Sequence, residues 1–274
     1  MSPDKTVVVV GYGSIGKVHA KNAADLGWKV ITVDPDLSTM ADCTHIEWII
    51  DRHECDDISH AIIATPIDYH LSCLHQVIDT LPTVTSILIE KPLFNPNDPD
   101  DAIRLNVLDT NVKLCVGFNW RFHLAMRAIK EKIEMLGDLQ YASLSAREWV
   151  PKITNDVWLQ SGSHILDTAR YLLGDLMHNS FSRVDNPDGQ LVSAQLTRCD
   201  NPMRRLLCEI HINACNRGEY DYRIVAQGTL GGLWWHLHPD PDMHFREMEA
   251  FLGDQKGLAT LQDGIENVKL LAAG

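Results

Sequence analysis

The chain has 274 residues, of which 45% are hydrophobic and 22% are charged, and its formal net charge is −13 at pH 7. This length predicts two domains, which we place at residues 1–118 and 119–274. An acidic chain without a run of lysine or arginine offers no electrostatic surface for nucleic acid or an anionic membrane, so we expect a small-molecule ligand.

The cysteines and the N-terminus bear on the cellular compartment. The seven cysteines are scattered, odd in number and without a Cys-x-x-Cys pair, which favours buried thiols in a reducing compartment. The first residues lack a basic segment followed by a long apolar one, and no stretch of the chain could span a bilayer. We therefore expect a cytoplasmic protein.

The first predicted element is a buried parallel strand at residues 6–10, which leads directly into Gly-Tyr-Gly-Ser-Ile-Gly. The first two glycines permit a tight turn and close approach of a pyrophosphate, and the third permits helix–strand packing. The helix that follows ends at Gly27, so its N-terminal N–H groups would face the phosphates. The cofactor-binding residues expected here are Gly11, Gly13, Ser14, Ile15 and Gly16.

A second strand is predicted at residues 28–33, and it ends on Asp34. A carboxylate at this distance from the glycine turn is placed to bind the adenosine ribose diol of a dinucleotide. Pro35 and Asp36 follow, and no arginine or lysine is present to neutralise a 2′-phosphate. We therefore expect NAD rather than NADP.

Strands and helices continue to alternate up to residue 118, as is typical of parallel βαβ units. The expected elements are a strand at 60–64, a helix at 71–81, a strand at 86–89, a helix at 102–109 and a strand at 112–117. The first of these strands ends on Thr65-Pro66 and the second on Glu90-Lys91-Pro92. The connection that follows Asp34 is brief and poorly patterned, which predicts an abridged crossover.

After residue 118 the pattern changes to strands without intervening helices, which predicts a mostly antiparallel sheet. The expected strands lie at 139–148, 191–197, 205–212, 222–226 and 233–237, and the expected helices at 124–136, 164–173, 244–252 and 261–272. The predicted fold class is α/β: a Rossmann doubly wound parallel sheet, followed by an α+β domain with a large, mostly antiparallel open sheet.

Lys91 is a candidate catalytic residue because it follows a parallel strand, at the sheet edge where α/β folds collect ligands. An ammonium beside a substrate hydroxyl favours the alkoxide-like state that develops as hydride leaves, and it can share in proton transfer. The alternative is a surface lysine paired with Glu90.

His164 is the second catalytic candidate, because imidazole is suited to carrying a hydroxyl proton near neutral pH. Asp167 lies three residues further along the predicted helix and so shares a face with it. Without other information, a histidine at the start of an apolar helix also fits a capping or packed residue.

The chain resembles the glucose-fructose oxidoreductase and inositol dehydrogenase family (Gfo/Idh/MocA) nearly from end to end. The motifs that carry the resemblance are the glycine fingerprint with His19, Ala64-Thr65-Pro66 with His70, Glu90-Lys91-Pro92, Gly117-Phe118-Asn119-Trp120-Arg121-Phe122, Gly162-x-His164-x-x-Asp167 and Glu247-x-x-x-Phe251-Leu252. The resemblance implies a Rossmann domain that carries NAD or NADP. It also implies a second domain whose sheet covers the site and forms the oligomer interface, as a homodimer or homotetramer.

The resemblance also implies roles for individual residues. Lys91 and His164 would face the nicotinamide and the substrate, and Asn119 and Arg121 would lie near the substrate. The residues that would line the cofactor site are Thr65, Pro66, His70, Glu90 and Lys91.

Position 160 departs from the family pattern, because family dehydrogenases usually carry an aspartate four residues before the catalytic histidine and this chain has Gln160. An amide cannot stabilise an imidazolium as a carboxylate can, so a weaker proton relay is expected. Asp156 or Asp167 could substitute for the missing carboxylate. We place Gln160 among the substrate-binding candidates.

Two further clusters have alternative interpretations. His236, His238 and His244, with the aspartates between them, could be read as metal ligands, but their spacing fits no standard site and favours a structural role. Trp149 and Trp158 could stack on a sugar ring, and we take Trp149 as a substrate-binding candidate, although core packing is the commoner role of tryptophan.

These features predict an NAD-dependent oxidoreductase that acts on a secondary alcohol or ketone of a sugar, cyclitol or sugar derivative. Because Gln160 replaces the usual aspartate, a second hypothesis is that the protein binds NAD without turnover and acts as a sensor. An NAD-assisted glycosidase, which uses transient oxidation to cleave a glycosidic bond, is the third hypothesis. No metal is expected.

Overall fold

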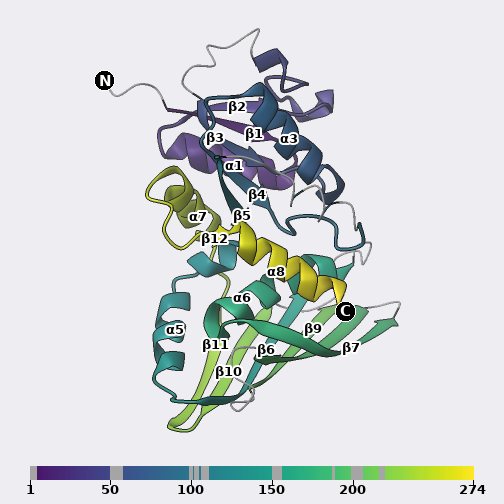
Figure 1. Cartoon of the computed structure of the whole chain (residues 1–274), viewed down its shortest axis with the longest axis vertical. Coiled ribbons are helices and arrows are strands. Elements are labelled where there is room, and N and C mark those ends of the chain that lie inside the picture. The colour runs from purple at the N-terminus through teal and green to yellow at the C-terminus, as the bar shows by residue number, and fades with distance from the viewer. Residues whose placement is uncertain are drawn as a thin grey trace. The chain divides into compact units, whose positions relative to one another are not determined.

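The computed structural model describes residues 5–49, 58–98, 101, 105, 111–149, 156–186, 189–198, 206–215 and 220–274. Contacts divide the chain into two compact units (Figure 1), Met1–Phe122 with Asp242–Ile265 and His123–Pro241 with Glu266–Gly274. The expected division after residue 118 cuts the sequence once, whereas each compact unit includes a second segment from the C-terminal part of the chain.

The first unit is built on a six-stranded sheet with the order β12-β5-β4-β3-β1-β2. Its strands are β1 (Thr6–Val10), β2 (Lys29–Val33), β3 (Ile58–Ile63), β4 (Ser86–Glu90), β5 (Lys113–Gly117) and β12 (Ala259–Thr260). β1 to β5 pair in parallel, and β12 runs antiparallel against β5. Every residue of β1 is buried, because a strand inside a parallel sheet is covered on both faces. The predicted parallel sheet is confirmed.

The helices of the first unit include one from the C-terminal part of the sequence. Those in the described residues include α1 (Ser14–Asp25), α3 (His70–Thr80), α7 (Met243–Leu252) and the first part of α8 (Leu261–Ala272), with the 3-10 segments η1 (Leu37–Thr39), η3 (Ile67–Tyr69) and η4 (Asn119–Phe122). α7 packs on α1, and its Met248 and Phe251 share a buried cluster with Ala20 and Ala23. The helix predicted at 102–109 lies outside the described residues, apart from Leu105.

The second unit contains a six-stranded sheet with the order β11-β10-β6-β9-β8-β7. Its strands are β6 (Leu139–Trp149), β7 (Leu176–Asn186), β8 (Gly189–Arg198), β9 (Leu207–Cys215), β10 (Asp221–Gly228) and β11 (Gly231–Leu237). Four strand pairs are antiparallel and β6–β9 is parallel, which confirms the mostly antiparallel sheet. The helical segments are α5 (Met126–Glu134), the π-helical η5 (Trp158–Gly162), α6 (Ser163–Leu173) and the C-terminal half of α8 (Leu261–Ala272).

β7 was not among the predicted strands. It is an edge strand, and most of its side chains are exposed or half-buried, so its sequence lacks the alternation of apolar and polar residues that marks a strand with one buried face. A bulge between His178 and Ser180 further interrupts the alternation. Among the described residues, no helix is long and apolar enough to cross a membrane.

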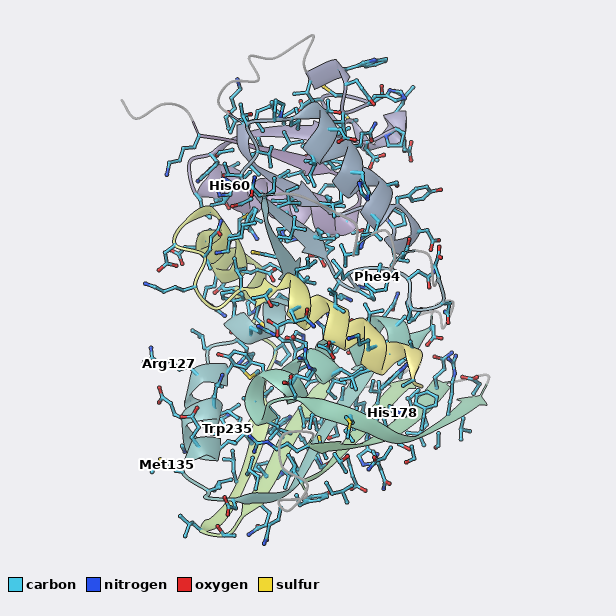
Figure 2. The ribbon with its side chains drawn as sticks, viewed as in Figure 1. His60, Phe94, Arg127, Met135, His178 and Trp235 are labelled. Atoms are coloured by element: carbon cyan, nitrogen blue, oxygen red, sulfur yellow. The ribbon has the colours of Figure 1, made fainter. Side chains whose placement is uncertain are left out.

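His60 makes the stability of the first unit dependent on pH. The imidazole of His60 (Figure 2) packs edge-on against Trp28 and Phe251, with ring centroids 4.9 and 5.2 Å away. Burial, with a smaller contribution from the charge of Lys5, lowers the pKa of His60 from 6.5 to about 4. The folded state therefore holds His60 neutral at pH values where the unfolded chain binds a proton, and stability falls as the pH drops from 6.5 to about 4.

Replacing His60 by glutamine is expected to remove this pH dependence. The wild type should lose up to roughly 3 kcal/mol of unfolding free energy over that pH interval beyond what His60→Gln loses, because each pKa unit corresponds to about 1.4 kcal/mol. Urea unfolding of both proteins at several pH values measures the difference. Parallel curves for the two proteins would contradict the prediction.

Candidate functional site

The glycine turn between β1 and α1 has the geometry expected of a phosphate cradle. Gly11 has a φ of +92°, a conformation that favours glycine, and its N–H donates to the Val33 carbonyl at 2.8 Å. A β-carbon at Gly16 would lie 1.9 Å from the Gly11 carbonyl oxygen, so the turn can pass the helix this closely only without a side chain. Gly13 precedes α1, and a β-carbon there would meet nothing within 4 Å. The turn therefore leaves open space in front of the N-terminus of α1.

Asp34 follows β2 and faces the same cavity as the glycine turn. Its Oδ2 accepts a hydrogen bond from the N–H of Tyr12 at 2.7 Å, and its Oδ1 accepts one from the N–H of Asp36 at 2.9 Å. A carboxylate has about four acceptor sites. Two sites therefore remain for a diol, while the carboxylate itself is held in place by the backbone.

The cavity has a volume of about 640 Å³ and is lined by part of the expected cofactor-binding set. Its lining includes Gly11, Gly13, Asp34, Thr65 and Pro66. Among the described residues that line it there is no lysine or arginine, whereas Asp36 adds a second carboxylate. This lining is suited to a nucleoside with a free ribose diol and is unsuited to a 2′-phosphate.

His70 braces two loops of the first unit. Its side chain is buried, with Nε2 2.9 Å from the Thr65 carbonyl and Nδ1 3.0 Å from the Pro92 carbonyl. Burial lowers the pKa of His70, although these carbonyls and Glu90 act in the opposite direction. His70 is outside the cavity lining described above and positions the segments after β3 and β4.

Glu90 and Lys91 follow directly from β4. The Glu90 carboxylate is buried, with Oε1 2.6 Å from Nε2 of His19, and Oε2 accepts a hydrogen bond from the backbone N–H of Lys91 at 3.2 Å. Burial alone would raise the pKa of Glu90, but the hydrogen bond with His19 and neighbouring positive charges outweigh it and lower the pKa. Glu90 thus anchors the backbone from which the half-buried Lys91 side chain extends.

Asn119 and Arg121 lie on η4 and contact the C-terminal segment of the first unit. Nδ2 of Asn119 lies 3.0 Å from Nε2 of His244, and Nη1 of Arg121 lies 3.3 Å from a carboxylate oxygen of Asp263. Burial lowers the pKa of His244; the nearby Glu90 charge opposes this and the Lys91 charge adds to it. The charge of Lys91 thus acts on His244, which is itself in contact with Asn119.

In the second unit, Gln160 and His164 lie at a π-helical turn that leads into α6. Gln160 lies within η5 with an exposed side chain, and the half-buried His164 is the second residue of α6. π-helical turns are rare and occur frequently at functional sites. Asp167 is fully buried, and Asp156 accepts hydrogen bonds from Arg183 and from the N–H of Trp158, both at 2.8 Å.

Glu148 is a half-buried carboxylate of this region that the sequence did not single out. Its carboxylate accepts hydrogen bonds from the hydroxyls of Ser161 and Tyr222, the latter at 3.0 Å. Burial and the Glu148 charge raise the pKa of Tyr222. Glu148 lies near the end of β6, where a polar side chain has no sequence signature, and the side chain of its neighbour Trp149 is outside the described part of the structure.

The three histidines considered as a metal cluster belong to two different compact units. His236 lies on β11 of the second unit and His238 directly follows that strand; their ring centroids are 4.7 Å apart, and Nε2 of His236 pairs with Asp221 at 2.9 Å. His244 belongs to the first unit, where α7 brings it to Asn119. The contacts that the structure gives His244 therefore involve other residues than its sequence neighbours His236 and His238.

No protein-family model matches the chain, and no curated protein matches its sequence. Solved structures do match its fold. Scyllo-inositol dehydrogenase from Lactobacillus casei, with bound NAD(H) and scyllo-inositol, is 15% identical with a TM-score of 0.77, covering 98% of this chain and 95% of that chain. Myo-inositol dehydrogenase from Corynebacterium glutamicum is 20% identical, with a TM-score of 0.73 and coverage of 98% and 95%.

A third solved structure has a nucleotide sugar bound. The WlbA dehydrogenase from Thermus thermophilus, in complex with NAD and UDP-GlcNAcA, is 16% identical with a TM-score of 0.73, covering 98% of this chain and 94% of that chain. At these identities the likeness shows the fold. The chain has the fold of these dehydrogenase structures, with a Rossmann sheet and a second, mostly antiparallel sheet.

Proposed function

We propose that the chain is an NAD-dependent oxidoreductase that transfers a hydride between the nicotinamide and a secondary alcohol or ketone of a sugar, cyclitol or sugar derivative. The observation that carries the proposal is the cavity that the glycine turn and the Asp34 carboxylate line together. The structures that share the fold and contain NAD with scyllo-inositol or UDP-GlcNAcA support the cofactor and the substrate class.

The residues of the cavity fit NAD because the glycine turn is open at Gly13 and Asp34 retains acceptor capacity. When bound, NAD supplies the hydride acceptor. Lys91 would polarise the substrate oxygen, with its backbone held by Glu90, and His164 would carry the hydroxyl proton. The proposed substrate-binding residues are Asn119, Arg121, Trp149 and Gln160.

The proposal is tested by following NADH absorbance while the purified protein is offered NAD with myo-inositol, scyllo-inositol or UDP-GlcNAcA. We expect NADH formation with at least one polyol or nucleotide sugar, and less with NADP. NAD binding without any NADH formation across the panel would contradict catalysis and support the sensor hypothesis instead.

Replacing Asp34 by asparagine is expected to weaken NAD binding by about 10–100-fold, because a hydrogen bond to a charged group contributes about 1.5–3 kcal/mol. The amide also removes the charge that disfavours a 2′-phosphate, so the preference for NAD over NADP should shrink. Calorimetric titration with both dinucleotides measures the two effects. Asp25→Asn is the matched control, since Asp25 is exposed at the end of α1; equal affinities of the two variants would contradict the role of Asp34.

Replacing Gln160 by aspartate is expected to raise kcat by about tenfold or more, because a carboxylate stabilises the imidazolium that forms when His164 takes a proton. The change should also shift the pH dependence of kcat. Gln160→Asn, which shortens the side chain equally but keeps the amide, is the control. A kcat of Gln160→Asp no higher than that of Gln160→Asn would show that His164 does not depend on this position.

We also propose that the second sheet mediates a homodimer or homotetramer. Val184 and Leu191 are cross-strand neighbours on β7 and β8 and are 49% and 47% exposed, and Trp234 on β11 is 63% exposed. Val184 and Leu191 form an exposed apolar pair at the β7 edge, and Trp234 lies on β11 at the opposite edge, so apolar side chains are exposed at both edges of the sheet.

A further inference from the structure

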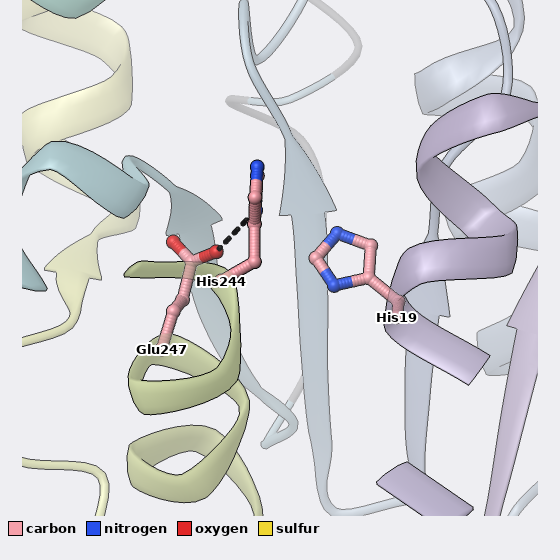
Figure 3. A group of neighbouring side chains, drawn as sticks. All are labelled: His19, His244 and Glu247. Atoms are coloured by element: carbon pink, nitrogen blue, oxygen red, sulfur yellow. Dashed lines mark ion pairs between the residues drawn. The ribbon is translucent and has the colours of Figure 1, made fainter. Parts of the chain in front are cut away.

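Three side chains with metal-binding chemistry meet between two helices of the first unit. His19 lies on α1, and His244 and Glu247 lie on α7 (Figure 3); one ligand atom from each residue lies within 4.8 Å of the others. His19 and Glu247 are fully buried, whereas the His244 side chain is 30% exposed. The α1–α7 packing is therefore what brings these residues together, and a path to solvent remains at His244.

His19 presents a lone pair to this cluster. Its Nε2 lies 2.6 Å from the Glu90 carboxylate, which can only accept, so in the neutral imidazole Nε2 carries the proton and Nδ1 has the lone pair. Nδ1 is buried and has no hydrogen-bond partner among the described residues. Metal-binding histidines have the same arrangement, in which one ring nitrogen donates to a carboxylate and the other binds the metal.

His244 can be oriented in the same way by Asn119. The amide of Asn119 lies 3.0 Å from Nε2 of His244, and a half-turn of the amide exchanges its nitrogen for its oxygen. With the oxygen facing His244, Oδ1, which has no hydrogen-bond partner among the described residues, would accept from Nε2–H. Nδ1 of His244 would then be unprotonated, 3.8 Å from a carboxylate oxygen of Glu247.

We propose that His19, His244 and Glu247 bind a divalent transition-metal ion, with Zn²⁺ as the best match. Two imidazoles and one carboxylate favour Zn²⁺ over Mg²⁺ or Ca²⁺, which prefer oxygen ligands. In tetrahedral coordination with bonds of about 2.0 Å, neighbouring ligand atoms lie about 3.3 Å apart. The 3.8 Å distance between Nδ1 of His244 and the Glu247 carboxylate oxygen would therefore shorten by about half an ångström. Water from the exposed side of His244 can occupy the fourth position.

The bound ion would link α1 to α7, two helices from opposite ends of the chain, and would strengthen the hydrogen bond from His19 to Glu90. Metal binding at these three residues requires neither NAD nor a substrate, although Glu90 and Asn119, which orient the two histidines, are also placed near the proposed catalytic site. Metal binding therefore tests this inference alone.

The test is a titration of the full-length, chelator-treated protein with Co²⁺, whose visible d–d absorption reports four-coordinate binding, followed by displacement with Zn²⁺. We expect one Co²⁺ per chain, displaced by Zn²⁺, and a rise in the melting temperature with either ion. If the wild type shows no one-to-one binding, the inference is overturned without reference to any variant.

Glu247→Gln keeps the shape of the side chain but removes the anionic ligand, and we expect its Co²⁺ affinity to fall by more than about tenfold. Glu249→Gln removes the same charge from an exposed position of the same helix and should bind as the wild type does. Equal affinities of the two variants would overturn the assignment, as would binding that is lost in His236→Gln. Should Glu247→Gln not fold, Glu90→Gln replaces it, with an expected loss of about 10–100-fold.

Discussion

Replacing Lys91 by methionine is expected to lower kcat by about 10²–10⁴-fold, the usual contribution of a positioned acid or base. Methionine retains much of the length and volume of lysine but can neither hold a proton nor stabilise a developing alkoxide. The hydrogen bond from the backbone N–H of residue 91 to Glu90 is independent of the side chain. The variant should therefore fold and bind NAD while losing turnover.

Lys113→Met is the matched control for this experiment. Lys113 is exposed at the first position of β5, and it pairs with Ser86, the first residue of the parallel strand β4. Lys91 follows the last residue of β4, so the two lysines lie at opposite ends of the strands. Steady-state rates and NAD titrations of both variants separate the chemical step from binding. Lys91→Arg adds a second discrimination, because arginine keeps the charge but does not release a proton in proteins. Full activity of Lys91→Met would show that the lysine takes no part in the chemical step.

The parts of the fold that could be predicted from the sequence are those that a short, continuous residue pattern specifies. The valine run of β1, the glycine turn, α1 and the Asp34 carboxylate follow one another within a single βαβ unit, and each has a residue pattern of its own. β7 gave no comparable signal, because an edge strand with exposed side chains needs no apolar alternation.

The contacts that could not be predicted join residues far apart in sequence. Asn119 and His244 are 125 residues apart, and His19 meets both α7 residues only because that helix packs on α1. The sequence spacing groups His244 with His236 and His238, but the chain leaves β11 and enters the first unit between them. Sequence spacing therefore could not identify His19 and Glu247, which lie near His244 through the packing of α7 on α1.

Two glycine substitutions in the turn are expected to separate folding from cofactor binding. Gly16→Ala should lower the unfolding free energy by about 3 kcal/mol or more, because its β-carbon would lie 1.9 Å from the Gly11 carbonyl oxygen, which is fixed by the turn. Gly13→Ala meets nothing within 4 Å, and its φ of −75° is accessible to alanine. Its stability should therefore stay within about 1 kcal/mol of the wild type.

The same methyl group at position 13 would occupy the open space in front of α1. If the pyrophosphate of NAD binds there, Gly13→Ala should weaken NAD binding by about 5–150-fold, which corresponds to about 1–3 kcal/mol of overpacking. Urea unfolding and calorimetric titration of both variants measure the two quantities independently. Wild-type NAD affinity in a stable Gly13→Ala protein would place the phosphates elsewhere, and the N–H groups of α1 would then have no part in binding the cofactor.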